Sequence, residues 1–442
     1  MIIFIPESIR APPKMAISKR RWMVFTMAES LKHLMILLSC ILSILMPAMA
    51  FDYSLEIFGN ANLDDIIDEN DIKYIQGVIN GQNNATELAD ANHDGTIDEL
   101  DIVQVDLIIN GQEKNLTFID AQGKAVTIKK PITKIVILSD PQADAIRILG
   151  AEDKVVGISS SLADEKILLQ KISELPTVGG DARGQGTDYE AILALNPDIV
   201  LPAGTGDAEL EEKMNQRVSV VRFDLYKPEI MPKEIMELGY ILDKKSQAKE
   251  FGDFYSRILN TIKEGTANLS DNEKPRVFYC GYPSAGYRYY AILPNQWLGS
   301  VCDIAGGNNI AKDLAGPEVD PEWVMVQNPD IILVHEGSKL PSGYDTDDVS
   351  GAEKVIKQIT NETGFANLDA VKNKRIYIEA SDIDSGTQSF IAMAFMAKLF
   401  HPDIFKDLDP KSIHQEYLTR FQRIDYNLDE HGVFFYPPLE VV

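Results

Sequence analysis

Two acidic segments of the chain repeat one spacing of oxygen-bearing side chains. The first reads NANLDDIIDENDIKYIQGVINGQ over residues 60–82, and the second reads DANHDGTIDELDIVQVDLIINGQ over residues 90–112. A duplicated segment usually represents one supersecondary unit used twice. Calcium takes about six to eight oxygen ligands, which a short loop can wrap around the ion from regularly spaced carboxylates and amides. The spacing therefore predicts two calcium-binding loops.

Each loop carries its oxygens at positions 1, 3, 5, 9 and 12, and an apolar-periodic helix follows it. The first loop has Asp65 at the sharp turn where the second has Gly95, so we expect its backbone to be more strained there. A solvated acidic face is the alternative interpretation, but it does not account for a ligand spacing that occurs twice. The predicted calcium ligands are Asn60, Asn62, Asp64, Asp68, Asp71, Asp90, Asn92, Asp94, Thr96, Asp98 and Asp101.

The repeat also resembles a known module. Asp at loop position 12, one helix after each loop and the closing NGQ resemble a dockerin module, over residues 55–112. The resemblance implies a small all-α domain that folds around Ca²⁺. It also implies docking on a cohesin-like or surface-layer partner.

Charge divides the chain into three zones. The net charge is -25, which argues against nucleic acid as a partner. Residues 1–50 are net basic, whereas residues 51–115 carry fifteen acidic and two basic side chains. The remaining residues are moderately acidic. The acidic excess per residue is therefore highest in the zone that contains the predicted calcium loops.

The basic leading zone resembles an export signal. Residues 34–46 form an apolar run that is too short to span a bilayer comfortably, and Arg20, Arg21 and Lys32 precede it. Ala48-Met49-Ala50 then offers a small-x-small cleavage site. The sequence predicts residues 1–50 to be a signal peptide cleaved near Ala50, which places the rest outside the cytoplasm as a secreted or cell-surface protein.

Three features of the export prediction stay open. The chain could begin at Met15 or Met27, the apolar run could remain as an anchor, and Leu38-Ser39-Cys40 weakly resembles a lipoprotein box. Export also makes a disulfide between Cys280 and Cys302 one interpretation of the remaining cysteines. Two buried free thiols are the other.

From residue 116 onward, strand and helix patterns alternate, as in a mostly parallel α/β sheet. An internal repeat is more informative: EAILALNPDIVL at 190–201 matches EWVMVQNPDIIL at 322–333. Each copy reads as a short helix closed by Asn-Pro-Asp and then a strand covered on both faces. This repeat predicts that the two lobes share one architecture.

A helical stretch separates the two copies, with apolar residues at helical spacing from Phe251 to Ile262. The expected fold is α/β, with two Rossmann-like lobes joined by one long helix and preceded by the small all-α domain. The expected divisions are residues 1–50 signal peptide, 55–112 dockerin-like domain, 116–228 N-terminal lobe, 229–270 linking helices and 271–442 C-terminal lobe.

This body resembles the substrate-binding proteins of ABC importers, of the iron-siderophore and cobalamin type (class III, with a helical backbone). The resemblance covers residues 116–430 and rests on the order of its motifs. They are TFIDAQGKAVTI, ITKIVIL, DYEAILALNPDIVL, IAGGNNIAKDL, PEWVMVQNPDIILV, LDAVKNKRIY and AKLFHPDIF. It implies a metal chelate clamped between two lobes that close by only a small motion.

The resemblance also implies a membrane partner, an ABC permease with its ATPase. Family members carry one acidic residue on each lobe that docks onto permease arginines, and the matching positions here are Glu190 and Glu322. Carboxylates held apart on two lobes could form charge-assisted pairs with a two-fold partner. The alternative is that both simply favour the positive end of a helix.

Ligands of open α/β sheets bind beyond the carboxyl ends of strands. Those ends include Ser139-Asp140, His335-Glu336 and Ser381-Asp382. The stretch YCGYPSAGYRYYAILPNQW at 279–297 gathers rings and one guanidinium, which suit a large planar or anionic chelate. We predict Tyr282, Tyr287 and Arg288 as ligand-binding residues, with His335 as a ligand of a metal or haem. Buried core tyrosines and a structural histidine are the alternatives.

Three functions compete on this sequence. The first is an exported solute-binding protein that delivers an iron chelate, haem or corrinoid to an ABC permease. The second is a surface protein whose dockerin-like part is primary and whose body no longer serves transport. The third is an enzyme on a related fold, but the sequence contains no nucleophile–base pair, cofactor fingerprint or metal triad, so no catalytic residue is predicted.

Overall fold

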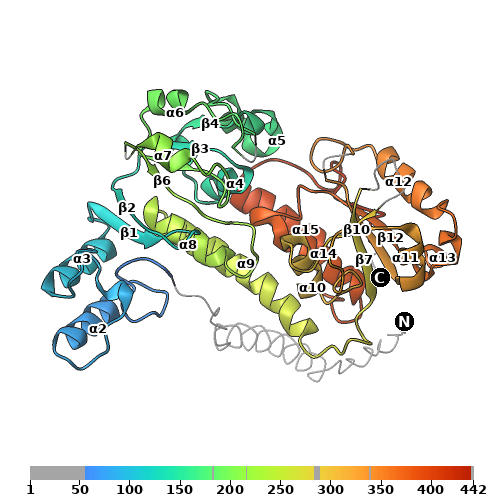
Figure 1. Ribbon diagram of the computed structural model, residues 1–442, viewed down its shortest axis with the longest axis horizontal. Helices are drawn as coiled ribbons and strands as arrows, with labels where there is room; N and C mark the ends of the chain where they lie inside the picture. The colour runs from blue at the N-terminus through green and yellow to red at the C-terminus, as the bar shows by residue number, and fades with distance from the viewer. Residues whose placement is uncertain (1–54, 182–183, 216, 283–288, 338–339, 440–442) are drawn as a thin grey trace, which may run out of the picture. The chain divides into compact units, whose positions relative to one another are not determined.

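The computed structural model describes residues 55–181, 184–215, 217–282, 289–337 and 340–439. The chain is an α/β protein with two separate, mostly parallel sheets (Figure 1). The predicted signal peptide, residues 1–50, lies outside the described residues. No helix among the described residues is both long and apolar enough to cross a membrane.

The two acidic repeats form near-identical units. Helix α2 (Glu69–Ile79) follows the first loop and α3 (Glu99–Asn110) follows the second, with a short 3₁₀ turn (Glu87–Ala89) between them. Asp68 and Asp98 cap these helices with the same extended backbone and the same reciprocal capping box. The duplication predicted from the sequence is therefore present in the fold.

The described residues of the repeat region and of the body belong to one compact unit. Phe58 N donates to Thr117 O at 3.0 Å, and Ile119 N donates to Glu56 O at 2.8 Å. Glu56 N also donates to the buried Glu237 Oε1 at 2.9 Å. These bonds join the start of the repeat region to the hairpin of β1 (Asn115–Ile119) and β2 (Ala125–Lys129) and to helix α8 (Met231–Ile241).

The N-terminal lobe is a four-stranded parallel sheet of order β4-β3-β5-β6. Its strands are short and buried, as expected for a sheet with helices on both faces. The strands are β3 (Ile135–Ile137), β4 (Val155–Ile158), β5 (Ile199–Leu201) and β6 (Ser219–Val220), and the helices are α4 (Asp140–Ile148), α5 (Lys166–Leu169), α6 (Tyr189–Leu195) and α7 (Leu210–Met214).

The C-terminal lobe has a five-stranded sheet of order β13-β12-β11-β7-β9, in which only β13 is antiparallel. A separate two-stranded ribbon pairs β8 with β10. The strands are β7 (Arg276–Gly281), β8 (Tyr289–Tyr290), β9 (Asn308–Asn309), β10 (Glu318–Val319), β11 (Ile331–His335), β12 (Ile376–Glu379) and β13 (Phe435–Tyr436). The helices are α10 (Trp297–Ile304), α11 (Pro321–Gln327), α12 (Ser350–Thr360), α13 (Asp369–Lys372), α14 (Ser389–Phe400) and α15 (Pro410–Glu416).

The structure confirms that the repeated sequence motif adopts the same local fold in both lobes. Helices α6 and α11 both end at an asparagine in the left-handed conformation, Asn196 and Asn328. The aspartate after each proline then accepts backbone hydrogen bonds from the neighbouring segment, Asp198 from Thr133 N at 2.6 Å and Asp330 from Arg276 N at 2.8 Å. The Asn-Pro-Asp motif thus ends a helix and aligns the following strand in both lobes.

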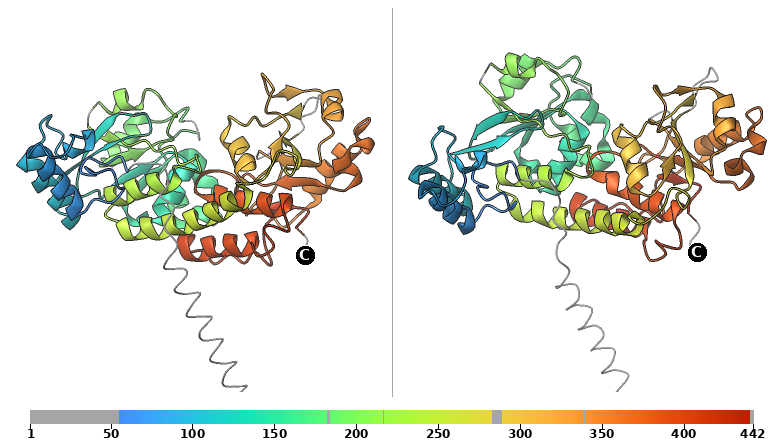
Figure 2. Two further views of the ribbon diagram at one scale, coloured as in Figure 1. Left: turned by 90° about the horizontal axis from the view of Figure 1, so that it is seen from below. Right: turned by 60° about the horizontal axis from the view of Figure 1, so that its bottom comes forward.

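Two consecutive helices, α8 and α9 (Lys245–Thr266), connect the lobes (Figures 1 and 2). Helix α9 buries an apolar face that includes Phe251 and Tyr255. Phe251 packs against Phe390 of α14 and Phe421 of the following π-helix (Tyr417–Gln422), with ring centroids 6.4 and 5.2 Å apart.

The chain also crosses between the lobes a second time, which the sequence did not predict. Arg147 Nε of α4 donates to Gln422 Oε1 at 2.9 Å, and the guanidinium of Arg423 donates to Ile148 O at 3.1 Å. Gln422 and Arg423 lie near the C-terminus but bind the N-terminal lobe. The connection is therefore a packed bundle rather than one helix.

Candidate functional site

A cavity of about 230 Å³ lies between the two lobes. Its N-terminal wall comes from the start of α4 and the segment around α5, and its C-terminal wall comes from the loop after β12. Both walls follow the carboxyl ends of parallel strands, where ligands of α/β sheets bind. The lining residues are Asp140, Pro141, Asp144, Glu165, Leu168, Leu169, Ser381, Asp382, Ser385, Gly386 and Gln388.

The lobes touch at one edge of this cavity. Asp144 Oδ2 accepts hydrogen bonds from Gln388 Nε2 at 3.1 Å and from Thr387 Oγ1 at 3.2 Å. Beside them Gly386 has φ of +59°, and a Cβ there would lie 3.1 Å from the ring of Pro141. Glycine allows this close approach because it has no side chain. Asp144 is therefore held across the interface between the lobes.

The charged groups that line the cavity are all carboxylates. Four of its lining residues are acidic and none is a lysine or arginine, within the part of the chain that the structure describes. Burial raises the pKa of Asp144, Glu165 and Asp382 to about 7 each, and neighbouring carboxylates act in the same direction. Hydrogen bonds from Gln388 to Asp144 and from Tyr344 N to Asp382 oppose the shift in pKa.

His335 ends strand β11 on the C-terminal side, and it does not itself line the cavity. Its neighbour Glu336 accepts from Ser381 Oγ at 2.7 Å, and Ser381 does line the cavity. His335 Nδ1 lies 2.5 Å from Oδ2 of Asp384, which is fully buried. Because an ionised carboxylate only accepts, this contact places the imidazole proton on Nδ1 and leaves Nε2 for a ligand.

Charge near the ring also affects the titration of His335. Burial lowers the pKa of this imidazole, but the hydrogen bond to Asp384 and the charges of Asp384 and Glu336 outweigh burial, so the pKa is raised above its ordinary value. A histidine that is oriented by a carboxylate is the usual arrangement at metal centres. Among the described residues, however, no group of three or more His, Cys, Asp or Glu is arranged to hold a bare metal ion.

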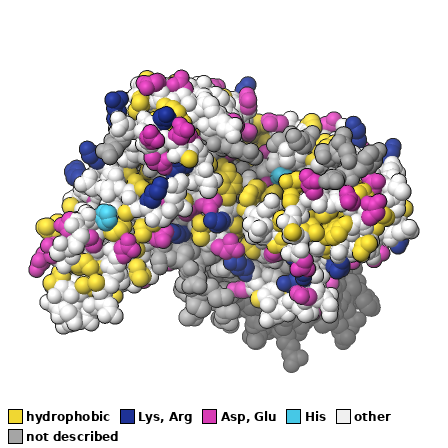
Figure 3. All heavy atoms as spheres, in the orientation of Figure 1, with side chains coloured by type: hydrophobic (Ala, Val, Ile, Leu, Met, Phe, Trp, Pro, Cys, Tyr) yellow, Lys and Arg dark blue, Asp and Glu magenta, His cyan; other side chains and the backbone are white. Residues whose placement is uncertain are grey.

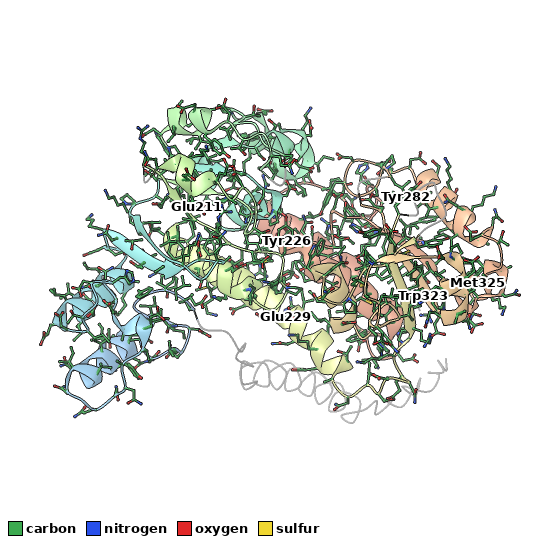
Figure 4. The ribbon with its side chains drawn as sticks, viewed as in Figure 1. Glu211, Tyr226, Glu229, Tyr282, Trp323 and Met325 are labelled. Carbon is green, nitrogen blue, oxygen red and sulfur yellow. The ribbon has the colours of Figure 1, made fainter. Side chains whose placement is uncertain are left out.

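Two rings from opposite lobes meet near the cavity. Tyr226, in the segment before α8, lies 5.9 Å from Trp297 of α10 between ring centroids. Burial, followed by the charges of Asp140, Asp224 and Asp144, raises the pKa of Tyr226 to about 12. Figure 4 places Tyr226 between the two lobes, whereas Tyr282 and Trp323 lie within the C-terminal one. Trp297 is therefore placed to report on the inter-lobe space.

The predicted aromatic stretch is only partly brought to the site. Tyr282 is half-buried and packs against the C-terminal core, while Tyr279 and Tyr289 are core residues. Tyr287 and Arg288 lie outside the described residues.

Two of the cavity carboxylates, Asp144 and Glu165, were not predicted from the sequence, although the strand ends that carry Asp140 and Asp382 were. The i, i+4 spacing of Asp140 and Asp144 on one helix was the available signal, because it places both side chains on one helix face. For Glu165 no pattern within its own segment indicates a place beside the other lobe.

The disulfide interpretation is wrong, because Cys280 and Cys302 are both buried free thiols. Cys280 shares a core cluster with Phe278 on one face of β7. Cys302 lies on the opposite side, close enough to affect the pKa of Tyr279, and burial, followed by the charges of Asp303 and Glu379, raises the pKa of Cys302 itself. Successive strand residues point to opposite faces, so the sheet separates the two sulfurs.

The two predicted calcium loops share their internal hydrogen bonds. Asn62 N donates to Asp71 Oδ1 at 3.1 Å, as Asn92 N donates to Asp101 Oδ1 at 3.0 Å. Thr96 N donates to Asp94 Oδ1 at 3.0 Å, and the first loop has the same contact between Ile66 and Asp64. At loop position 1 of the first copy, Asn60 Oδ1 is buried and has no hydrogen-bond partner among the described residues.

The turn positions of the two loops match the expectation. Asp65 and Gly95 both have positive φ, +69° and +92°. Asp65 Oδ1 accepts a hydrogen bond from Leu55 N at 2.6 Å, which helps to hold a non-glycine residue there.

Glu190 and Glu322 occupy equivalent places in the two lobes. Each lies in the first turn of its helix, α6 or α11, and each is exposed. Val326, one turn beyond Glu322, is 82% exposed. On the face in Figure 3, acidic and basic side chains are intermixed, and the described residues form no continuous basic patch there.

Comparison with known proteins agrees with this geometry. A family model described as periplasmic binding protein matches residues 135–382. The chain belongs to the periplasmic binding protein family. This family member is a solute-binding protein. Its relatives are components of ABC importers, in which a permease and an ATPase are the partners. The relatives are extracytoplasmic binding proteins rather than enzymes.

One similar relative is the high-affinity heme uptake system protein IsdE of Staphylococcus aureus, 28% identical over 250 residues, which cover 54% of this chain and 78% of IsdE. Among solved structures, the TroA-like periplasmic binding protein FepB of Veillonella parvula has a TM-score of 0.60 at 23% identity, over 72% of this chain and 98% of FepB. MolA of Haemophilus influenzae, bound to molybdate, has a TM-score of 0.56 at 19% identity, over 70% and 99%. These similarities to solved structures show that the fold is shared.

Proposed function

We propose that this periplasmic binding protein carries a metal chelate, such as haem, a ferric siderophore or a corrinoid, in the cavity between its lobes. The observation that supports the proposal most is His335, whose Nδ1 is held by the buried Asp384 and whose Nε2 is left for a ligand. A chelate already fills most positions around its metal, so one imidazole is enough to complete the shell. The relative named for heme uptake supports the same ligand class.

Titration with coloured chelates tests this proposal. Haemin, a ferric hydroxamate and a corrinoid would each be added to the whole mature chain, and the absorption spectrum of the metal would be recorded. Saturable binding of one chelate with a spectral change typical of imidazole ligation is the expected result. No saturable binding of any of the three would refute the proposal and would favour a surface protein without a transport role.

Glu190 and Glu322 are proposed to dock on the permease of the importer. Their equivalent exposed places on the two lobes support this role. A contact between charged side chains at the rim of an interface depends on the sign of each charge. In cells, we expect the pair Glu190→Lys and Glu322→Lys to abolish uptake while the purified variant binds ligand with unchanged affinity. Loss of ligand binding itself would contradict a docking role.

The repeat region is proposed to be a dockerin-like calcium module. The duplicated loop hydrogen bonds, the matched capping boxes and the partnerless Asn60 Oδ1 support this assignment. In the described residues the loop carboxylates are not gathered into a metal-binding group. Calcium binding would draw them around each ion, and Asn side chains and backbone oxygens would complete the coordination shell. A cohesin-like or surface-layer partner would then have the exposed Leu100 and Val103 of α3 available for contact.

Removal of calcium is expected to destabilise the protein. A ligand present at about a thousand times its Kd contributes about 4 kcal/mol, which corresponds to a fall of several degrees in melting temperature when a chelator removes it. Thermal melts in Ca²⁺ and in EDTA measure this difference. Asp101→Ala should remove the contribution of the second loop to the calcium-dependent part, whereas Asp106→Asn on the same helix should retain it. Identical melts with and without calcium would contradict the module assignment.

Export is proposed to remove the leading segment near Ala50. The extracytoplasmic setting of related binding proteins supports this. N-terminal sequencing of the secreted protein tests it, and a chain that still begins upstream of residue 34 would argue for an uncleaved anchor.

A further inference from the structure

A second cavity, of about 570 Å³, lies in the C-terminal lobe. It is lined by the end of α14, the loop that follows, the start of α15 and the C-terminal segment around β13, and we call it the α14–α15 cavity. Among the described residues, none lines both this cavity and the one between the lobes. The α14–α15 cavity is therefore a separate site, and its wall has a different chemistry.

Aromatic rings form much of this wall. Phe395 of α14 and Phe435 of β13 are stacked, with ring centroids 5.2 Å apart and ring planes within 8° of each other. Phe395 is only half-buried, although most of its neighbours on α14 are buried. Phe434 and Leu408 line the same cavity. Flat rings favour a planar apolar ligand, because ring faces and edges pack closely against it.

The charged residues of the wall balance one another. Three lysines and three aspartates line the cavity in the described chain, and four of these six are already bonded within the protein. Lys398 Nζ donates to two backbone carbonyls, and Lys411 Nζ lies 2.6 Å from Asp429 Oδ1. Asp409 accepts a backbone hydrogen bond as the cap of α15. The wall therefore favours a neutral ligand, since a charged one would lose its hydration without gaining an opposite charge.

Buried hydrogen bonds connect the two cavities. Gln388, which lines the inter-lobe cavity, donates through Nε2 to Asp144 Oδ2 at 3.1 Å. Its Oε1 accepts from the hydroxyl of Tyr344 at 2.8 Å. The same hydroxyl oxygen lies 2.7 Å from Nε2 of His414, which lines the α14–α15 cavity and is 1% exposed. Three buried side chains of one lobe thus form a continuous chain of hydrogen bonds.

The order of donors in this chain fixes the tautomer of His414. An ionised Asp144 only accepts, so the amide nitrogen of Gln388 faces it and the amide oxygen faces Tyr344. The single hydroxyl proton of Tyr344 is donated to that oxygen, and Nε2 of His414 must therefore donate to the hydroxyl. Burial lowers the pKa of His414 to about 3, so the ring is neutral and carries one proton. Its Nδ1 is consequently an acceptor, on a buried side chain of the cavity wall.

We infer that the α14–α15 cavity binds a neutral, planar aromatic molecule with one N–H or O–H group, which donates to Nδ1 of His414. The rings of the wall supply apolar contact area, and the hydrogen bond sets the orientation of the ligand. The inference does not rest on the proposed function, because the chelate site and this cavity share no residue in the described chain.

Indole and benzofuran test this inference. The two molecules have nearly the same bicyclic shape, but indole has an N–H group where benzofuran has a ring oxygen. Equilibrium dialysis against the whole mature chain, at pH about 8.5 where Asp144 is ionised, would measure the affinity for each. We expect saturable binding of indole at one site, about five- to tenfold tighter than that of benzofuran, because one neutral hydrogen bond contributes about this much.

Two substitutions in one loop test the location of the site. Leu408→Trp places a bulky ring in the cavity wall and should weaken binding of both compounds by at least about tenfold. Ile404→Trp is the matched control, because Ile404 is 46% exposed and is not among the residues that line the cavity. This variant should bind indole as the unmodified chain does.

Two further substitutions test the hydrogen bond. His414→Phe keeps a ring but removes the acceptor, so it should bring the ratio of the two affinities close to one. Tyr344→Phe removes the group that fixes the tautomer, and it should lower the same ratio part of the way. A purely structural role of either residue would instead change both affinities together. Circular dichroism of each variant checks that it is folded.

Four outcomes would overturn the inference. They are no saturable binding of indole, equal affinity of the unmodified chain for both compounds, indole binding that survives Leu408→Trp, and a preference for indole that survives His414→Phe. Failure of the chelate titrations would bear on the proposed function alone, because those titrations concern the other cavity.

Discussion

Replacement of His335 by alanine is expected to weaken chelate binding by at least about 100-fold and to abolish the spectral change of the metal. The imidazole is oriented by the buried carboxylate of Asp384, and its neighbour Glu336 contacts the cavity residue Ser381. Asp384→Asn should weaken binding by about ten- to a hundredfold, because an amide nitrogen can turn toward the ring and favour the other tautomer. Absorption titrations of the purified variants measure both effects.

His431→Ala is the matched control for this experiment. His431 also has its Nδ1 next to an aspartate, Asp347 at 3.1 Å, but both of these side chains are exposed. Its removal should leave affinity and spectrum unchanged. Added imidazole should restore the spectrum of the His335→Ala protein, since the space left by the side chain admits it. An unchanged spectrum in His335→Ala without imidazole would show that the residue is structural.

Phe251→Ala is expected to have the largest effect on stability. The ring is fully buried and contacts Phe390, Phe421 and Tyr417, which join α9 to the segment that crosses back to the N-terminal lobe. Truncation of a buried phenylalanine costs about 3–5 kcal/mol, because apolar burial decreases and a space is left behind. Denaturant unfolding followed by circular dichroism would measure the decrease in the free energy of unfolding.

A surface residue of the same helix provides the comparison. Asp253 is exposed on α9 and pairs with Lys249 in a surface ion pair, so Asp253→Ala should change stability by less than about 1 kcal/mol. If Phe251→Ala were as mild as this, the aromatic cluster would not be what holds the lobes together. The lobe connection would then depend on α8 and α9 alone.

The elements with strong local signals were predictable from the sequence. Apolar runs without alternation identified β5 and β11, and Asn-Pro-Asp marked the helix ends before them. The repeated oxygen spacing likewise predicted two equivalent loops, whose hydrogen bonds match. In each case the signal lies within about a dozen residues, where backbone sterics and capping decide the conformation.

The cavity wall depends on contacts that sequence patterns do not carry. Asp144 and Gln388 are far apart in the chain, and only the packing of α4 against the loop after β12 brings them together. The same holds for Arg147 and Gln422, which belong to different lobes in the sequence but share a hydrogen bond. The disulfide interpretation failed for a related reason, because spacing alone does not show that a sheet lies between two cysteine side chains.

Trp297 can report whether the space between the lobes holds the ligand. Trp323→Phe leaves Trp297, whose ring lies 5.9 Å from Tyr226 of the other lobe, as the single tryptophan of the chain after residue 50. We predict that a metal chelate quenches the fluorescence of this variant saturably, with the affinity found by absorption. Absence of quenching across haem, ferric siderophores and corrinoids would show that the ligand does not bind between the lobes.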